Sequence, residues 1–265
     1  MFGPLSHRAA FLSMCTAALT AAFFLPAVRG EACSCMGPDL GVLTPQRPDG
    51  VPTNTRVRVT MPAIAQGQSS PTLALRVHGG REIAATSHVY PDVAESIVEL
   101  TPTAPLAPST RYEVAVVDAA KHPATTVVST FVTGTTADVA APVLDALGSV
   151  GARKNVRFGG GDCSIQGPWV TIDGFRAHDP GRSDAELVFG VWGKDAKGVL
   201  DTNRPPDTLI TPDRNALTIG RSSLCDMRDF LLTGAIVPLA IAVVDEAGNR
   251  SAPRRFTVDV SRSSP

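Results

Sequence analysis

The sequence predicts an all-β protein: two tandem β-sandwich domains that follow an N-terminal signal peptide. Three observations lead to this prediction. Apolar and polar residues alternate in short runs, 22 prolines and 23 glycines lie scattered between the runs, and the pattern stops and restarts near the middle of the chain. Alternation with a period of two is typical of half-buried strands. So many prolines and glycines leave little room for long helices and favour many turns.

The first 30 residues have the pattern of a secretory signal peptide. His7 and Arg8 precede an apolar stretch at residues 9–28, and small residues follow it. Hydroxyl side chains and Pro26 interrupt this stretch, so it falls short of the roughly 20 apolar residues that a membrane span needs. We therefore expect cleavage near Gly30 or Ala32, no transmembrane span in the mature chain, and export to the periplasm, the outer surface or the extracellular space.

A lipid anchor on Cys33 is the alternative after cleavage at Ala32. It is disfavoured because Gly30 stands where bacterial lipoprotein signals carry leucine, and because Glu31 is charged.

The mature chain keeps four cysteines, an even number that suits an oxidising compartment. The disulfide candidates are Cys33, Cys35, Cys163 and Cys225. Four cysteines allow three pairings, and we favour Cys163 with Cys225 because both lie in the second half of the chain. A metal site on the first two is weak, since no second close pair and no nearby histidine accompanies them. We expect no cofactor.

The composition favours a folded protein that does not bind nucleic acid. Hydrophobic residues make up 43% and charged residues 18% of the chain, which has a net charge of −1. Loss of Arg8 and Arg29 with the leader makes the mature charge about −3. Such a chain can bury a core, and it carries no basic field for phosphates.

In the first half, strands are expected at residues 56–61, 72–77, 96–100, 111–117 and 126–133. Strict alternation in the last of these runs places Val127, Ser129 and Phe131 on one face, and the residues between them on the other.

The predicted organisation has five parts: the signal peptide at 1–30, a cysteine-containing segment at 31–39, the first sandwich at 40–135, a linker at 136–141 and the second sandwich at 142–262. The linker is small, polar and closed by Pro142. Strands of the second sandwich are expected at residues 143–147, 169–172, 187–192, 216–219, 239–244 and 256–260. Residues 222–232 are expected to form a short turn or helix.

Two motifs in the first half resemble bacterial Ig-like domains of the SbsA type. The opening motif is PQRPDGVPTNTRVRV at residues 45–59. The closing motif runs through LTPTAPLAPSTRY at 100–112 and STFVTG at 129–134. The resemblance covers roughly residues 40–135 and implies an immunoglobulin-like sandwich.

Part of the closing motif has a physical meaning of its own. Pro108 fixes a corner, Leu106 and Tyr112 point inward, and the tyrosine hydroxyl can return to the backbone at that corner. This predicts a structural role.

The second half resembles the last hairpin of bacterial Ig-like and fibronectin-III-like modules in the segment IAVVDEAGNRSAP at residues 241–253. Asp245, Gly248 and Asn249 then form the turn between two strands. Asp245, Glu246 and Asn249 also offer oxygens to calcium, but calcium takes 6–8 oxygens, so the turn is the favoured interpretation.

Catalytic motifs are missing from the sequence, so we expect no enzyme. The run GGGD at residues 159–162 has no Lys-Ser or Lys-Thr after it, as a nucleotide-binding loop requires. Asp173, Asp179 and Asp184 lie near His178 in the sequence, where a solvated loop is the simpler explanation than an acid-base group.

His122 is a weak candidate copper ligand. The segment DAAKHP at residues 118–123 resembles part of the periplasmic copper-binding proteins of the CopC type, but Lys121 replaces their glycine and no histidine lies near Cys33.

The sequence therefore predicts a non-catalytic envelope or secreted protein that acts in adhesion, display or assembly, with a protein or envelope polysaccharide as its partner. The alternatives are a periplasmic copper or small-ligand carrier and a carbohydrate-binding accessory module.

Overall fold

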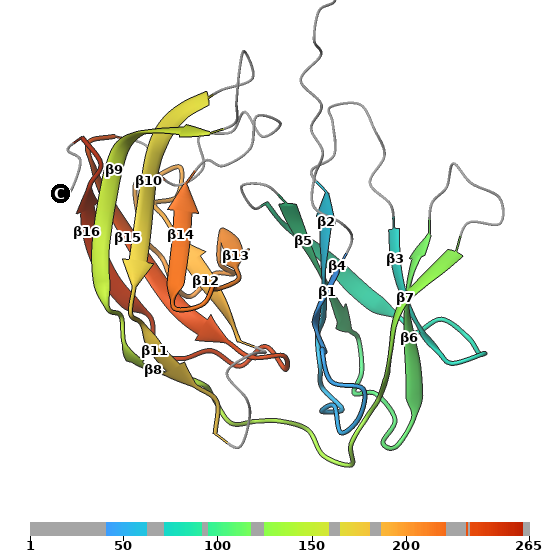
Figure 1. Ribbon diagram of the computed structural model, residues 1–265. Helices are drawn as coiled ribbons and strands as arrows, with labels where there is room; N and C mark the ends of the chain where they lie inside the picture. Colours follow the sequence, from blue (N-terminus) through green and yellow to red (C-terminus); the bar gives the residue numbers. More distant parts are fainter. Residues whose placement is uncertain are drawn as a thin grey trace, which may run out of the picture. The chain divides into compact units, whose positions relative to one another are not determined.

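In a computed structural model of the chain, the described residues form strands, turns and loops (Figure 1). The structure describes residues 41–62, 72–91, 95–117, 125–158, 165–180, 187–220, 232 and 234–261. All of these residues belong to one compact unit that spans residues 35–265. None of these segments forms a helix of the length and apolar character needed to cross a bilayer.

The first sandwich contains two antiparallel sheets. One has the strand order β1-β2-β5-β4, and the other has the order β3-β6-β7. The strands are β1 (Gly41–Thr44), β2 (Val57–Pro62), β3 (Thr72–Val77), β4 (Ala85–Pro91), β5 (Glu95–Pro102), β6 (Arg111–Val117) and β7 (Thr125–Val132). In β2 the apolar side chains of Val57, Val59 and Met61 join the core between the sheets, as the alternation predicts.

A bulge in β7 changes which of its residues face the core. The register against β6 shifts between Val114 and Ala115, which pair with Ser129 and Val127, so the pairing skips Val128. Val128 packs against the same core as Phe131, whereas Val127 is 43% exposed. The strict alternation expected from the sequence is therefore wrong here, because an extra residue reverses the faces on one side of the bulge.

The second sandwich contains a sheet of order β13-β12-β15-β16, a sheet of order β14-β10-β9 and the two-stranded pair β11-β8. The strands are β8 (Val143–Ala146), β9 (Ser149–Phe158), β10 (Ile165–Asp173), β11 (Arg176–His178), β12 (Val188–Trp192), β13 (Thr208–Ile210), β14 (Ala216–Gly220), β15 (Ile236–Val244) and β16 (Arg254–Asp259). Its core is almost wholly aliphatic.

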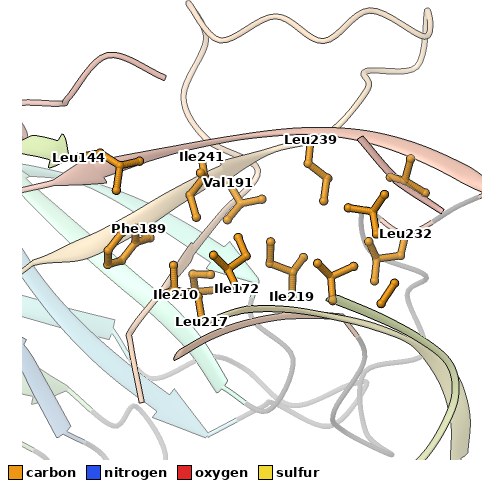
Figure 2. Close-up of a cluster of buried hydrophobic side chains, with 14 of the residues drawn as sticks. Leu144, Ile172, Phe189, Val191, Ile210, Leu217, Ile219, Leu232, Leu239 and Ile241 are labelled. Atoms are coloured by element: carbon orange, nitrogen blue, oxygen red, sulfur yellow. The ribbon is translucent and has the colours of Figure 1, made fainter. Parts of the chain in front are cut away.

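Figure 2 shows this core, to which both main sheets contribute. Ile172, Leu217 and Ile219 come from one sheet. Phe189 comes from the other, and Phe175 contacts it edge to face with ring centroids 4.8 Å apart. Each sandwich thus has its own apolar core, so contacts between the two sandwiches must use other faces of their sheets.

Candidate functional site

One face of the sheet β1-β2-β5-β4 lies away from the core of the first sandwich, and part of this face is nevertheless buried. Arg58 and Glu99 on this face are 0% and 3% exposed. Nearby, Tyr90 and Ile97 form an apolar cluster with side chains of the second sandwich, namely Val188, Leu209 and Val244. We call this contact the junction. It brings together polar residues from both sandwiches, and it is the candidate site.

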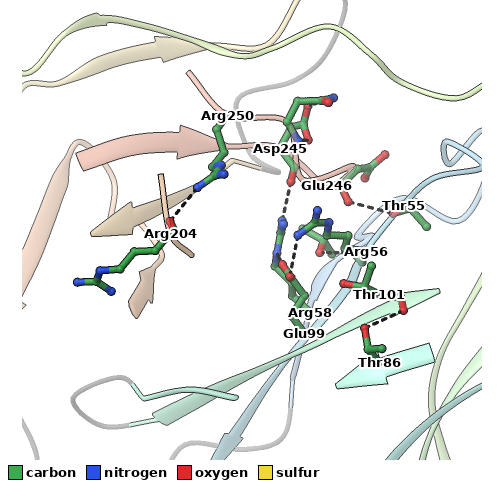
Figure 3. A network of polar contacts seen from close by, with 12 residues as sticks. Thr55, Arg56, Arg58, Thr86, Glu99, Thr101, Arg204, Asp245, Glu246 and Arg250 are labelled. Carbon is green, nitrogen blue, oxygen red and sulfur yellow. Dashed lines mark hydrogen bonds and ion pairs between the residues drawn. The ribbon is translucent and has the colours of Figure 1, made fainter. Parts of the chain in front are cut away.

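The polar centre of the junction is an arginine-glutamate network (Figure 3). Arg58 donates from Nε to Glu99 Oε2 at 2.8 Å, and Arg56 donates to Glu99 Oε1 at 3.0 Å. Burial by itself would raise the pKa of Glu99, but the charges and hydrogen bonds of the two guanidinium groups outweigh burial and lower this pKa. Glu99 is thereby held ionised between two cations.

The turn between β15 and β16 supplies the other side of the network. Arg58 donates from Nη1 to the carbonyl of Asp245 at 2.7 Å, and the Arg56 N–H donates to the carbonyl of Glu246 at 2.6 Å. The Glu246 carboxylate, whose side chain is fully buried, pairs with Arg47 at 2.7 Å. These bonds join the opening segment and β2 of the first sandwich to one turn of the second.

The turn has the conformation expected from its sequence. The Gly248 N–H donates to the Asp245 carbonyl at 3.2 Å, and the Asn249 N–H donates to Asp245 Oδ1 at 2.8 Å. Gly248 has a φ of +87°, and a Cβ atom added there would lie 2.2 Å from Arg56 Nε. Glycine is required at this position both for the left-handed backbone and for the close approach of Arg56.

Three carboxylates gather beside the turn. Candidate ligand atoms of Asp138, Asp179 and Asp245 all lie within 4.8 Å of one another. Burial raises the pKa of Asp245, Asp138 raises it further, and hydrogen bonds from Asn249 oppose the increase. Carboxylates this close favour a shared proton or a hard cation. Three carboxylates nevertheless fall short of the 6–8 oxygens that calcium takes.

Two asparagines tie Asp138 to both sandwiches through its backbone. Asn54 donates to the Asp138 carbonyl at 2.8 Å and accepts from the Asp138 N–H at 2.8 Å. Asn249 donates to the same carbonyl at 3.1 Å. The predicted linker is therefore hydrogen-bonded at this residue to the first sandwich and to the turn of the second.

The residues of the predicted corner lie together in the first sandwich. Leu106 and Tyr112 are 3% and 2% exposed, and the Ala107 N–H donates to the Tyr112 hydroxyl at 2.8 Å. The Tyr112 ring stacks on Phe131 at 5.6 Å. Pro108 carries the carbonyl that accepts from the Thr110 hydroxyl at 2.9 Å. These bonds and contacts stay within the first sandwich.

Several other residues singled out in the sequence lie outside the described ranges. They are the candidate cysteines Cys33, Cys35, Cys163 and Cys225, the weak copper candidate His122, Asp184, the GGGD run and residues 222–231 of the segment 222–232. Among the described histidines, His178 pairs with Asp145 at 2.9 Å, and His78 with Glu113 at 2.6 Å. Of the acids near His178 in the sequence, Asp179 is buried in the carboxylate group, whereas Asp173 is exposed.

Trp192 is fully buried. Its Nε1 donates to the Arg204 carbonyl at 2.9 Å, and the Arg250 guanidinium lies 5.8 Å from the ring centroid. The Arg250 guanidinium also donates to the Arg204 carbonyl, at 3.3 Å (Figure 3). A ring covered in this way packs against its own chain and presents no open platform for a ligand.

The comparisons with known proteins bear on the first sandwich most directly. Residues 37–136 match the family model of the bacterial Ig-like domain. No curated protein sequence matches the chain. The match ends at the close of the first sandwich. The chain is thus all-β with tandem immunoglobulin-like sandwiches, as the sequence predicts.

Two solved structures also align with the chain. Fibronectin(III)-like modules of CbhA from Clostridium thermocellum are 10% identical over 83% of this chain and 93% of theirs, with a TM-score of 0.26. A pullulanase from Anoxybacillus sp. LM18-11 is 8% identical over 82% of this chain, with a TM-score of 0.25, and the alignment covers 25% of the pullulanase. At these TM-scores neither alignment supports an argument about function.

Proposed function

We propose that this chain is a non-catalytic protein of the cell envelope or the secreted fraction, which acts in adhesion, display or assembly. The match of residues 37–136 to the bacterial Ig-like domain carries the proposal, in which this domain serves as a module of an exported protein. The signal-like pattern of the first 30 residues supports it independently. The resemblance of the opening and closing motifs to the SbsA type agrees with a surface role.

The hydrogen-bond partners of the buried charged residues also support a non-catalytic, structural role. Arg58 and Glu99 bond to each other, and Arg58 also bonds a main-chain carbonyl. Asp245 bonds the residues of its own turn. Charged groups used in this way hold the molecule together, and a catalytic acid or base would need to reach a substrate. Exposed loops and sheet faces are then the surfaces offered to a protein or polysaccharide partner.

Localisation provides the first test. A C-terminally tagged full chain is expected in the periplasmic, surface or medium fraction, and removal of residues 1–30 is the matched control that should leave the protein in the cytoplasm. Added protease distinguishes surface display from periplasmic retention in intact cells. Recovery of the full chain in the cytoplasm would contradict the proposal.

Binding provides the second test. The purified mature chain is expected to sediment with isolated envelopes, and excess unlabelled chain should displace it. Treating the envelopes with protease or with periodate distinguishes a protein partner from a polysaccharide partner. Absence of saturable sedimentation would rule out adhesion to these envelopes.

A further inference from the structure

Arg58 occupies a position that an isolated sandwich would leave in water. Its neighbours Val57 and Val59 fill the core of the first sandwich, so alternation places Arg58 on the outer face of the sheet. The side chain is nevertheless 0% exposed. Residues of the second sandwich pack on this face, as the apolar cluster around Tyr90 and Ile97 shows. Burial of the arginine is therefore a product of the junction.

Burial of a guanidinium costs less free energy where its donors are bonded and its charge is balanced. Arg58 obtains the charge balance within its own sandwich, from Glu99 on the neighbouring strand. It obtains the other bond, at 2.7 Å, from the carbonyl of Asp245 in the second sandwich. One side chain thus bonds to both sandwiches at once through Nε and Nη1, while its buried Nη2 has no hydrogen-bond partner among the described residues.

The acceptor turn is held in place by bonds that do not depend on Arg58. The Asp245 carboxylate accepts from the N–H and from the side-chain amide of Asn249, both at 2.8 Å. Gly248 removes the Cβ atom that would collide with Arg56. The turn of the second sandwich is therefore held in the conformation in which its carbonyls accept hydrogen bonds from Arg56 and Arg58.

We propose that Arg58 is a latch that joins the two sandwiches into one cooperative folding unit. Separating the sandwiches would return Arg58 and Glu99 to water, and would expose Tyr90 and Ile97 together with the apolar residues that cover them. An arginine-glutamate pair exposed to water contributes little to stability. The first sandwich consequently draws part of its stability from the second, and the two unfold together.

The aromatic residues of the chain allow a direct test. The two tyrosines, Tyr90 and Tyr112, lie in the first sandwich, and the two tryptophans, Trp169 and Trp192, lie in the second. During urea unfolding of the full mature chain, tryptophan fluorescence reports the second sandwich. Tyrosine second-derivative absorbance reports the first sandwich through Tyr112, and the junction through Tyr90. The wild-type protein is expected to show coincident transitions.

The test variant is Arg58→Gln with Glu99→Gln. Two glutamines can hydrogen-bond across the strands and are harmless on an exposed face, but glutamine is too short to keep the bond to Asp245. We expect the two transitions to separate by roughly 1 M urea. The matched control is Arg76→Gln with Glu113→Gln, which alters a cross-strand pair of the same sandwich away from the junction. Its transitions should stay coincident.

Two results would overturn the latch. Separate transitions in the wild-type protein would show that the sandwiches unfold independently, and coincident transitions in the Arg58→Gln, Glu99→Gln variant would place the coupling in the apolar cluster alone. Should this variant fail to fold, Gly248→Val replaces it. That substitution forces the turn away from Arg56 while both charges remain, and the same separation is expected.

Discussion

Two arginine-glutamate pairs in the first sandwich have almost the same chemistry and very different surroundings. In each, the two residues are direct cross-strand partners, Arg58 with Glu99 and Arg76 with Glu113. The N···O distances are 2.8 and 3.0 Å. The side chains of the first pair are 0% and 4% exposed, whereas those of the second are 30% and 13% exposed.

The comparison shows that the surroundings, and not the pair itself, decide what an ion pair does. Arg76 and Glu113 keep contact with water, which screens their attraction and already solvates both charges. Arg58 and Glu99 have lost that water to the second sandwich, so each depends on protein partners. Only the buried pair can report on whether the junction is intact.

The largest expected effect on stability is the difference in free energy of unfolding between Arg58→Ala and Arg76→Ala. The first substitution leaves Glu99 buried without its main partner, and removing one member of a buried pair costs about 3–5 kcal/mol. The second should cost roughly 0–1 kcal/mol, as exposed pairs do. Urea unfolding of both variants measures the difference. Equal losses would show that the burial of Arg58 has no energetic consequence.

The next largest loss of stability is expected from Gly248→Ala. The methyl group would lie 2.2 Å from Arg56 Nε and would also strain the backbone, whose φ is +87°. Gly198→Ala is the matched control, since Gly198 has a φ of +78° and no atom within 4 Å of the added Cβ. Strain alone costs of order 1–3 kcal/mol. Gly248→Ala should therefore lower the free energy of unfolding by more than Gly198→Ala does. An equal loss would mean that the Arg56 side chain moves away from the new methyl group at little cost.

A smaller loss of stability is expected from Tyr112→Phe. This substitution tests the hydrogen bond between the Ala107 N–H and the Tyr112 hydroxyl, which lies within the first sandwich. The substitution removes the acceptor of the Ala107 N–H and keeps the ring that stacks on Phe131. A lost hydrogen bond of this kind costs about 1 kcal/mol. The urea midpoint should fall while tyrosine and tryptophan signals still change together. An unchanged midpoint would show that water replaces the hydroxyl at the corner.

The sequence predicted the fold class well because alternation and turn residues are local signals. Strands with strict alternation, such as β2 and β3, were found at nearly their observed bounds. β9 was missed because its sequence, SVGARKNVRF, mixes glycine and charged residues without a regular period. β4 was missed for a similar reason, since ATSHVYP carries few apolar residues.

The junction was not predicted, because burial by a distant part of the chain leaves no local signal. Arg58 follows the pattern of any polar residue on the outer face of a strand, and nothing near it in the sequence indicates a cover. Asp138 lay in the expected linker, and Asp179 in an expected solvated loop. Asp245 was recognised as a turn residue, which is correct, but its neighbours in space come from more than 60 positions away in the sequence.

The last effect concerns pH: the ionisation of Glu99 is expected to stabilise the fold at neutral pH, and this stabilisation is expected to shrink in acid. Its pKa is lowered in the folded protein because the two arginines outweigh the effect of burial. Its ionisation therefore stabilises the fold above the ordinary glutamate pKa of about 4.3, and this contribution is lost as the pH falls through the lowered value. Asp245 acts in the opposite sense: burial raises its pKa, so its contribution is present below about 3.9 and is lost as the pH rises through the raised value.

Glu99→Gln separates these two contributions. The urea midpoint of the wild-type protein should exceed that of the variant at neutral pH, and the gap should narrow below about pH 4 as Glu99 takes up a proton. The variant lacks the contribution of Glu99 that is lost in acid, and it keeps the pH dependence of stability that is due to Asp245. Its free energy of unfolding should therefore fall less on acidification than that of the wild-type protein. A gap that stays constant from about pH 7 to about pH 3 would mean that Glu99 is not held ionised by the arginines, and the contrast with the exposed pair would then lose its electrostatic basis.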